Sequence, residues 1–203
     1  MVDVIVVGAR CAGATLATLL ARSGAKVLLL DAHGMPSGMP MSTHFIHAPG
    51  MAVLDEIGVG DAIRACNPPT RRFRFQVEEH ACNLDRTPDR YQYCPRRSTL
   101  DPLLLKAAQD AGADVVDHAH VTELVRDGDR VGGVVAETAQ GRRTFHAPLV
   151  VGADGRHSTV AKLVGAETYL SHEMTRAAYW FYFPEPPGWQ QAAPYADWQS
   201  YMG

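Results

Sequence analysis

Residues 2–31 decide the fold, and they read VDVIVVGARCAGATLATLLARSGAKVLLLD. An apolar run up to Val7 is followed by a turn that contains two glycines, Gly8 and Gly13. A stretch with helical spacing comes next, and a second apolar run stops at Asp31. This order predicts a strand, a glycine turn, a helix and a second strand that ends in an acidic residue. Such a βαβ unit is typical of proteins that hold a dinucleotide.

The residue types in this unit have physical reasons. Gly8 allows the tight turn after the strand, and Gly13 allows the helix to lie close against it. The start of the helix offers unpaired N–H groups and a partial positive charge, which favour a pyrophosphate. Asp31 can accept a hydrogen bond from a ribose 2′-hydroxyl and would repel a 2′-phosphate, so NADP is disfavoured at this turn. Arg10 replaces the usual second glycine, and its side chain must either point away from the phosphates or pair with one of them.

The composition is that of an ordinary soluble globular protein. Of the 203 residues, 46% are hydrophobic and 20% are charged, and the formal net charge is −3. No run of lysine and arginine is longer than a pair, so we expect no nucleic-acid partner and no membrane-binding face. No apolar run approaches the roughly 20 residues that cross a bilayer. The four cysteines and nine histidines form no ligand motif, so we expect no metal, and reduced thiols in a cytoplasmic protein.

Hydrophobic periodicity and turn residues predict the elements that follow. Helices are expected at 49–57, 61–65, 101–110 and 156–164. The third helix begins either at Asp101 and Pro102, as N-cap and first residue, or one turn earlier near Ser98. Strands are expected at 41–45, 71–77, 114–117, 121–126, 130–137 and 144–151. Tyr91 and Tyr93 suggest the antiparallel partner of strand 71–77. The first helix is expected to carry one apolar face made of Ala12, Leu16, Leu19 and Leu20.

Two further segments, taken together with the glycine turn, resemble a known family. The segment RSTLDPLL at 97–104 precedes a helix, and VGADGRHS at 151–158 follows a strand. With GARCAG at 8–13, their order and spacing are similar to the FAD-binding half of the para-hydroxybenzoate-hydroxylase-like flavoprotein monooxygenases. The resemblance covers roughly residues 2–165. It implies an α/β fold: a Rossmann-like FAD-binding domain with a parallel sheet, an added β-meander and the start of a β-rich substrate domain.

The resemblance also implies which residues lie near FAD. Those around the pyrophosphate would be Gly8, Arg10, Cys11, Ala12 and Gly13. Those along the rest of the cofactor would be Asp31 at the adenosine ribose, Val121 at the adenine, Arg97 at the flavin side and Thr43 nearby. Those packed under the phosphate loop, with a role in both FAD and NAD(P)H binding, would be Asp154 and Gly155. No residue is assigned a catalytic role, because in such enzymes the cofactor carries the chemistry.

The residues by themselves leave three of these interpretations open. Without the resemblance, a surface position is the more usual one for Arg97, and Asp154 could equally cap the helix that follows it. The aromatic run 179–183 either lines a substrate cavity or belongs to a core, and the second is more usual for an aromatic strand.

The resemblance implies an FAD-dependent oxidoreductase, a NAD(P)H-dependent monooxygenase that hydroxylates an aromatic or similar small molecule. We expect an FAD-binding domain at 1–165, in which 71–95 form strands shared with the substrate domain, and an incomplete substrate domain at 166–203. The family's second flavin motif lies beyond residue 203. We therefore expect either an N-terminal part of a longer enzyme or a chain completed by a partner. Alone it would be inactive and prone to self-association.

Two other functions remain open. One is a flavin-dependent reductase of the geranylgeranyl-reductase type, which shares the same N-terminal half. The other is a non-catalytic FAD-binding fragment. A flavin halogenase is disfavoured because the Trp-x-Trp-x-Ile-Pro motif of that class is absent.

Overall fold

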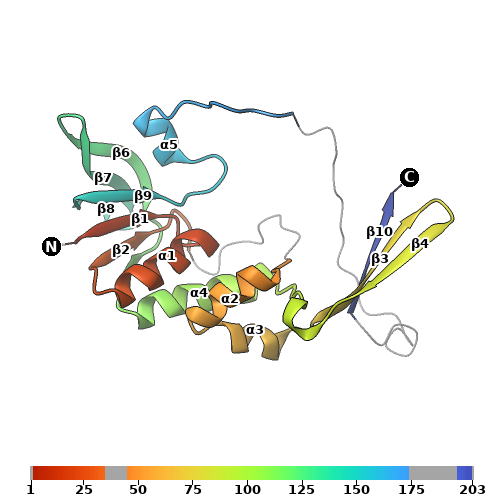
Figure 1. Ribbon diagram of the computed structural model, residues 1–203. Helices are drawn as coiled ribbons and strands as arrows, with labels where there is room; N and C mark the ends of the chain where they lie inside the picture. The colour runs from red at the N-terminus through yellow and green to blue at the C-terminus, as the bar shows by residue number, and fades with distance from the viewer. Residues whose placement is uncertain (1, 35–44, 174–195, 203) are drawn as a thin grey trace.

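The structure is a computed structural model, and it describes residues 2–34, 45–173 and 196–202. At its centre is a parallel sheet with the strand order β5–β2–β1–β9 (Figure 1). Its strands are β1 (Val4–Val7), β2 (Val27–Leu30), β5 (Asp114–Val116) and β9 (Leu149–Gly152). Because these strands are parallel, their carboxyl ends meet at one edge, which is where α/β sheets bind their ligands.

A group of helices lies on one side of this sheet (Figure 1). They are α1 (Cys11–Arg22), α2 (Ala48–Glu56), α3 (Gly60–Cys66) and α4 (Arg97–Asp110). Of these, α1 contacts β1 and β2 and packs against α4. Val4, Val6 and Leu29 of the sheet pack against this layer, while Ile5 and Val7 belong to a second core on the other face. The alternation follows from the two-residue period of a strand, and it explains why β1 and β2 are apolar at every position.

The buried face of α1 differs from the expected one. The helix buries Gly13, Ala14, Ala17 and Thr18, and the three leucines flank this strip. On the face expected to be apolar, Ala12 is exposed and the leucines are half-buried. Only small side chains fit where the helix lies closest to the sheet, and the leucines fill the wider gap beside it.

A β-meander and a short helix cover the second face of the sheet. These elements are β6 (His120–Asp127), β7 (Arg130–Thr138), β8 (Gly141–His146) and α5 (Thr159–Val164). The single strand expected at 144–151 is wrong, because the segment is divided between β8, which pairs with β7, and β9, which pairs with β1. Pro148 lies at the change of sheet, and it has no N–H to continue a ladder.

A third sheet projects away from this body (Figure 1). Its strands are β3 (Thr70–Val77), β4 (His80–Asp85) and β10 (Ala196–Met202). The partner expected for β3 at Tyr91 and Tyr93 is wrong, because β4 pairs with β3 antiparallel along its length. The tyrosine segment follows the 3₁₀ helix η1 (Pro88–Arg90), and it reaches β3 only through a bridge between Gln92 and Thr70. A two-residue turn, Glu78 and Glu79, joins β3 to β4, and so short a loop favours pairing between the two consecutive strands.

The earlier of the two starts considered for α4 is close to the observed one. The helix begins at Arg97, so Asp101 is an interior residue and not the N-cap. Pro102 therefore lies in the second turn, beyond the tolerated first turn, and it offers no N–H to the Ser98 carbonyl. The short strand expected at 41–45 and the aromatic run 179–183 lie outside the described residues, apart from Phe45.

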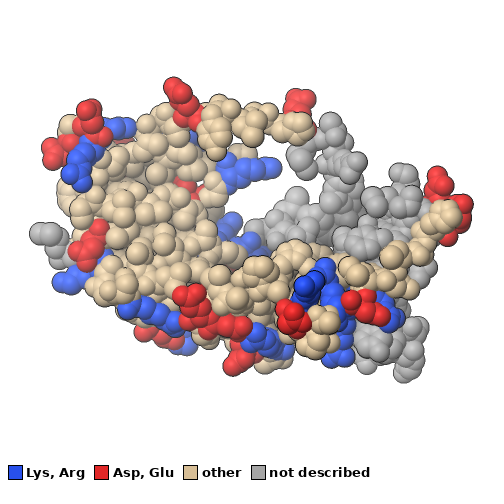
Figure 2. Space-filling view, viewed as in Figure 1, with Lys and Arg blue, Asp and Glu red and all other residues tan. Residues whose placement is uncertain are grey.

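Residues 166–173 form neither helix nor strand, and the domain boundary near residue 165 stays a prediction. Acidic and basic side chains alternate over the helical layer (Figure 2). Two of the ion pairs there are Arg64 with Asp55 and Lys106 with Asp110. Among the described helices, none is long and apolar enough to cross a bilayer.

Candidate cofactor site

The glycine turn between β1 and α1 is packed against the loop after β9. Gly8 has φ +102°, and a Cβ built on it would lie 2.5 Å from the Ala153 carbonyl oxygen. A Cβ on Gly13 would overlap the Gly8 carbonyl oxygen. The Ala153 N–H donates to the Val7 carbonyl at 2.7 Å, which joins the two loops. The expected roles of both glycines, a tight turn and a close approach of the helix, are confirmed.

The first turn of α1 offers donors that no described side chain uses. Arg10 is the N-cap residue and makes no side-chain capping bond, and no acidic residue lies in the first turn. The N–H groups of this turn therefore have no partner within the helix and face outward together with the positive end of its dipole. The Arg10 side chain forms no hydrogen bond or ion pair with the described part of the chain, so it is available to an anion.

Asp31 holds the glycine turn in place. Its carboxylate is 7% exposed, and Oδ2 accepts the Ala9 N–H at 2.7 Å. Oδ1 accepts the His33 N–H at 2.9 Å. Because each carboxylate oxygen has two lone pairs, further bonds to a ribose are compatible with these contacts. The structural role was missed from the sequence, which indicated only the ligand-binding one.

Asp154 caps α5, as one of its two interpretations predicted. Oδ2 accepts the N–H groups of Thr159 and Val160 at 2.7 and 3.0 Å, and Oδ1 accepts the Ser158 hydroxyl at 2.6 Å. Burial alone would raise the pKa of Asp154, but the hydrogen bonds from Ser158 and the backbone together hold it below the usual value. Gly155 has φ +86°, a conformation that glycine adopts without strain. The loop that these residues form contacts the glycine turn through Ala153.

Arg97 is not a surface arginine. Its side chain is 14% exposed and makes a two-point contact with Asp101, with Nε to Oδ1 at 2.6 Å and Nη2 to Oδ2 at 2.9 Å. The Cys11 thiol also donates to Asp101 Oδ1, at 3.8 Å. Burial raises the pKa of Cys11, so the thiol stays neutral. Asp101 was missed as a site residue, although its spacing of four from Arg97 was a usable signal for a pair.

The structure brings most of the expected residues to one edge of the parallel sheet. These are Gly8, Arg10, Cys11, Ala12, Gly13, Asp31, Arg97, Asp154 and Gly155. Val121 is 3% exposed and its side chain belongs to the second core, so this side chain does not face the edge where the other residues gather. Thr43 lies outside the described residues. A cradle too tight for a Cβ, free N–H groups and two nearby arginines fit a pyrophosphate-containing cofactor.

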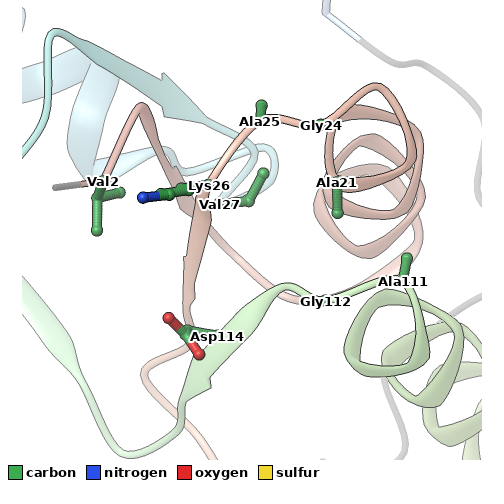
Figure 3. Close-up of a pocket in the computed structure, with 9 residues that line it drawn as sticks. All are labelled: Val2, Ala21, Gly24, Ala25, Lys26, Val27, Ala111, Gly112 and Asp114. Atoms are coloured by element: carbon green, nitrogen blue, oxygen red, sulfur yellow. The ribbon is translucent and has the colours of Figure 1, made fainter.

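Two hollows in the described surface lie elsewhere. One of about 260 Å³ is at the amino ends of the parallel strands, opposite the glycine turn, and Lys26 and Asp114 are its charged lining residues (Figure 3). The other, of about 440 Å³, lies between α1, α4 and the connection from α2 to α3. Among the described residues, no group of His, Cys, Asp and Glu side chains could hold a metal ion.

The fold and the site define a dinucleotide-binding α/β domain of the flavoprotein type. The chain belongs to the family described as FAD binding domain, whose profile matches residues 1–192. The structure is similar to that of OxyS anhydrotetracycline hydroxylase from Streptomyces rimosus, with a TM-score of 0.69 and 30% identity, over 80% of this chain and 33% of that one. The expected FAD-binding α/β fold is confirmed.

Curated relatives have several chemistries. The probable electron transfer flavoprotein-quinone oxidoreductase YdiS of Escherichia coli is 33% identical over 80% of this chain and 38% of its own length. The 6-methylpretetramide 4-monooxygenase of Streptomyces rimosus is 34% identical over 80% and 40%. The digeranylgeranylglycerophospholipid reductase 2 of Methanothermobacter thermautotrophicus is 32% identical over 82% and 42%. The chain thus spans about 40% of the length of these relatives.

Proposed function

We propose that this chain binds FAD and forms the cofactor-binding part of an NAD(P)H-dependent monooxygenase that hydroxylates an aromatic or similar small molecule. The observation that carries the proposal is the meeting of the glycine turn, the α1 N-terminus and the Arg97 region at one sheet edge. The monooxygenase among the relatives and the similarity to a solved hydroxylase support the choice of reaction.

Different residues of the chain would bind different parts of FAD. The N–H groups of the first turn of α1 and the Arg10 guanidinium would hold the pyrophosphate. Asp31 would accept a hydroxyl of the adenosine ribose, and Arg97 would donate on the flavin side. Bound FAD supplies the redox chemistry that amino-acid side chains lack.

We further propose that the protein works in the cytoplasm, without a nucleic-acid partner. The four cysteines, all described, are free, as is usual in a reducing compartment. We also propose that the chain associates with a further polypeptide or with itself. β9 is an edge strand of the described sheet, and its Leu149 is exposed, which leaves backbone and apolar surface available for pairing.

A flavin-dependent reductase of isoprenoid double bonds is the second candidate, because an archaeal relative of that kind matches over the same part of the chain. Assays of the active enzyme would distinguish the monooxygenase from the reductase. A monooxygenase consumes O₂ and adds an oxygen atom to a phenolic substrate. The reductase saturates an alkene without O₂. A non-catalytic FAD-binding protein would do neither.

Titration with FAD, FMN and 5′-ADP tests the proposed cofactor. We expect FAD and 5′-ADP to compete, and FMN, which lacks adenosine, to bind at least about tenfold more weakly. Arg10→Gln should weaken FAD binding, whereas Arg130→Gln on the exposed end of β7 is the matched control. Release of NAD instead of flavin from the denatured protein, with no FAD binding under any loading condition, would contradict the proposal.

A further inference from the structure

Asp101 is a buried carboxylate with no role in the proposed function so far. Its side chain is 1% exposed, and it lies inside α4, one turn after Arg97. A carboxylate is costly to bury unless cations and hydrogen-bond donors surround it. Asp101 has three such donors from two helices: Nε and Nη2 of Arg97, and the thiol of Cys11.

The contact between Asp101 and Arg97 fixes the orientation of the guanidinium plane as well as its distance from the carboxylate. Two parallel N–H···O bonds hold the guanidinium and the carboxylate in one orientation. Among the described residues, none accepts a hydrogen bond from Nη1 of Arg97, and the side chain keeps some exposure. The donors on Nη1 are therefore available to an acceptor from outside the chain.

The contact with Cys11 ties this pair to the phosphate turn. Cys11 is the first residue of α1, and its thiol donates to the oxygen that also accepts from Arg97 Nε. The N-terminus of α1 and the guanidinium are thus held beside each other by one carboxylate. The pair of Arg97 and Asp101 carries no net charge, so what it offers a ligand is directed N–H groups and not long-range attraction.

We propose that Asp101 is a positioning residue for FAD binding. It acts through Arg97, whose guanidinium it holds at a fixed place beside the phosphate turn, so that the free N–H groups of Arg97 meet the cofactor. This inference rests on the proposed function, because it takes FAD as the ligand. A carboxylate that served stability alone would affect every ligand of the site equally.

A double-mutant cycle on the 203-residue chain separates these roles. FAD and 5′-ADP affinities are measured for the unaltered chain, Asp101→Asn, Arg97→Gln and the double variant, with melting temperatures alongside. Asn is isosteric with Asp but lacks its charge, and Gln is shorter than Arg, lacks its charge and keeps an amide donor. Asp110→Asn is the matched control, because Asp110 makes the same i,i+4 contact with Lys106 on an exposed part of α4.

We expect Asp101→Asn and Arg97→Gln each to weaken FAD binding by about tenfold, as loss of a charge-assisted hydrogen bond would. The double variant should bind FAD no more weakly than Arg97→Gln, because Asp101 acts only through Arg97. Binding of 5′-ADP, which lacks the flavin side, should change by less than about twofold, and Asp110→Asn should change nothing.

Three results would overturn the inference: unchanged FAD affinity in Asp101→Asn, additive losses in the double variant, or an equal loss of FAD and 5′-ADP affinity. If Asp101→Asn does not fold, Asp101→Glu keeps the charge and displaces the guanidinium. It should weaken FAD but not 5′-ADP binding, and unaltered FAD affinity would then overturn the inference. Absence of FAD binding by the unaltered chain would instead overturn the proposed function, and this inference with it.

Discussion

Single residues at this site combine a structural contact with an expected ligand contact, and Asp31 is the clearest case. Its Oδ2 accepts the N–H of Ala9, which is fully buried. Its Oδ1 accepts the N–H of His33. Asparagine could replace only one of these acceptors, because its amino group would face an N–H. The carboxylate is therefore needed for the shape of the turn before any ribose arrives.

We predict that Asp31→Ala destabilises the ligand-free chain by about 1–3 kcal/mol, because the Ala9 N–H is left buried without an acceptor. FAD affinity should also fall by roughly tenfold or more. Urea unfolding and FAD titration measure the two effects. Asp129→Ala, on the exposed hairpin turn, is the control. An unchanged unfolding free energy for Asp31→Ala would show that the turn does not depend on this carboxylate.

The lowered pKa of Asp154 leads us to predict that the stability of the chain depends on pH. Its pKa in the folded chain lies below the ordinary value of 3.8, so its contribution to stability is fully present above that value. The contribution is lost as the pH falls below 3.8 and through the lower folded pKa. Urea unfolding of the unaltered chain and of Asp154→Asn should therefore differ most near neutral pH and converge in acid. A difference that grows toward acid pH would contradict the capping role.

At the scale of elements, the close approach of α1 to β1 depends on Gly13. A methyl group there would overlap the Gly8 carbonyl oxygen, which is backbone and cannot rotate away. We predict that Gly13→Ala destabilises the chain by roughly 1–3 kcal/mol, as overpacking does, and weakens FAD binding by moving the first turn of α1. Gly132→Ala is the matched control, because no described atom beyond its own residue and its two chain neighbours lies within 4 Å of a Cβ at that position. Equal stability of the two variants in urea would contradict this account.

The elements that sequence periodicity placed well are those with a strong local signal. For that reason we could predict the βαβ unit, the hairpin of β6 and β7, and the helices whose ends are marked by proline or glycine. The errors occurred where a long-range choice decided the outcome. One apolar run became two strands in different sheets, and the partner of β3 was the nearer β4.

At the scale of the whole molecule, most of the described residues that we expect near FAD are assigned to its adenosine and pyrophosphate parts. We predict that the 203-residue chain, given FAD and NAD(P)H, passes electrons to O₂ and releases hydrogen peroxide without hydroxylating a phenolic substrate. Hydroxylation needs a reduced flavin that is enclosed and shielded from water. Peroxide and hydroxylated product are measured together, with FAD-free protein as the control. Coupled hydroxylation by this chain alone would overturn the prediction.

The sequence by itself determined the dinucleotide-binding unit and the family. The two glycines, the acidic residue at the end of the second strand and the two further motifs are required by the local backbone, and their spacing along the chain is typical of the family. It also predicted a set of residues that would lie near the cofactor. Only the tertiary structure decided what their side chains do: that Asp31 holds the turn, that Val121 faces a core, and that Asp101 joins Arg97 to Cys11. The physical reason is that a side chain's partners depend on which segments pack together. That choice is made by burial across the whole fold rather than by its neighbours in sequence.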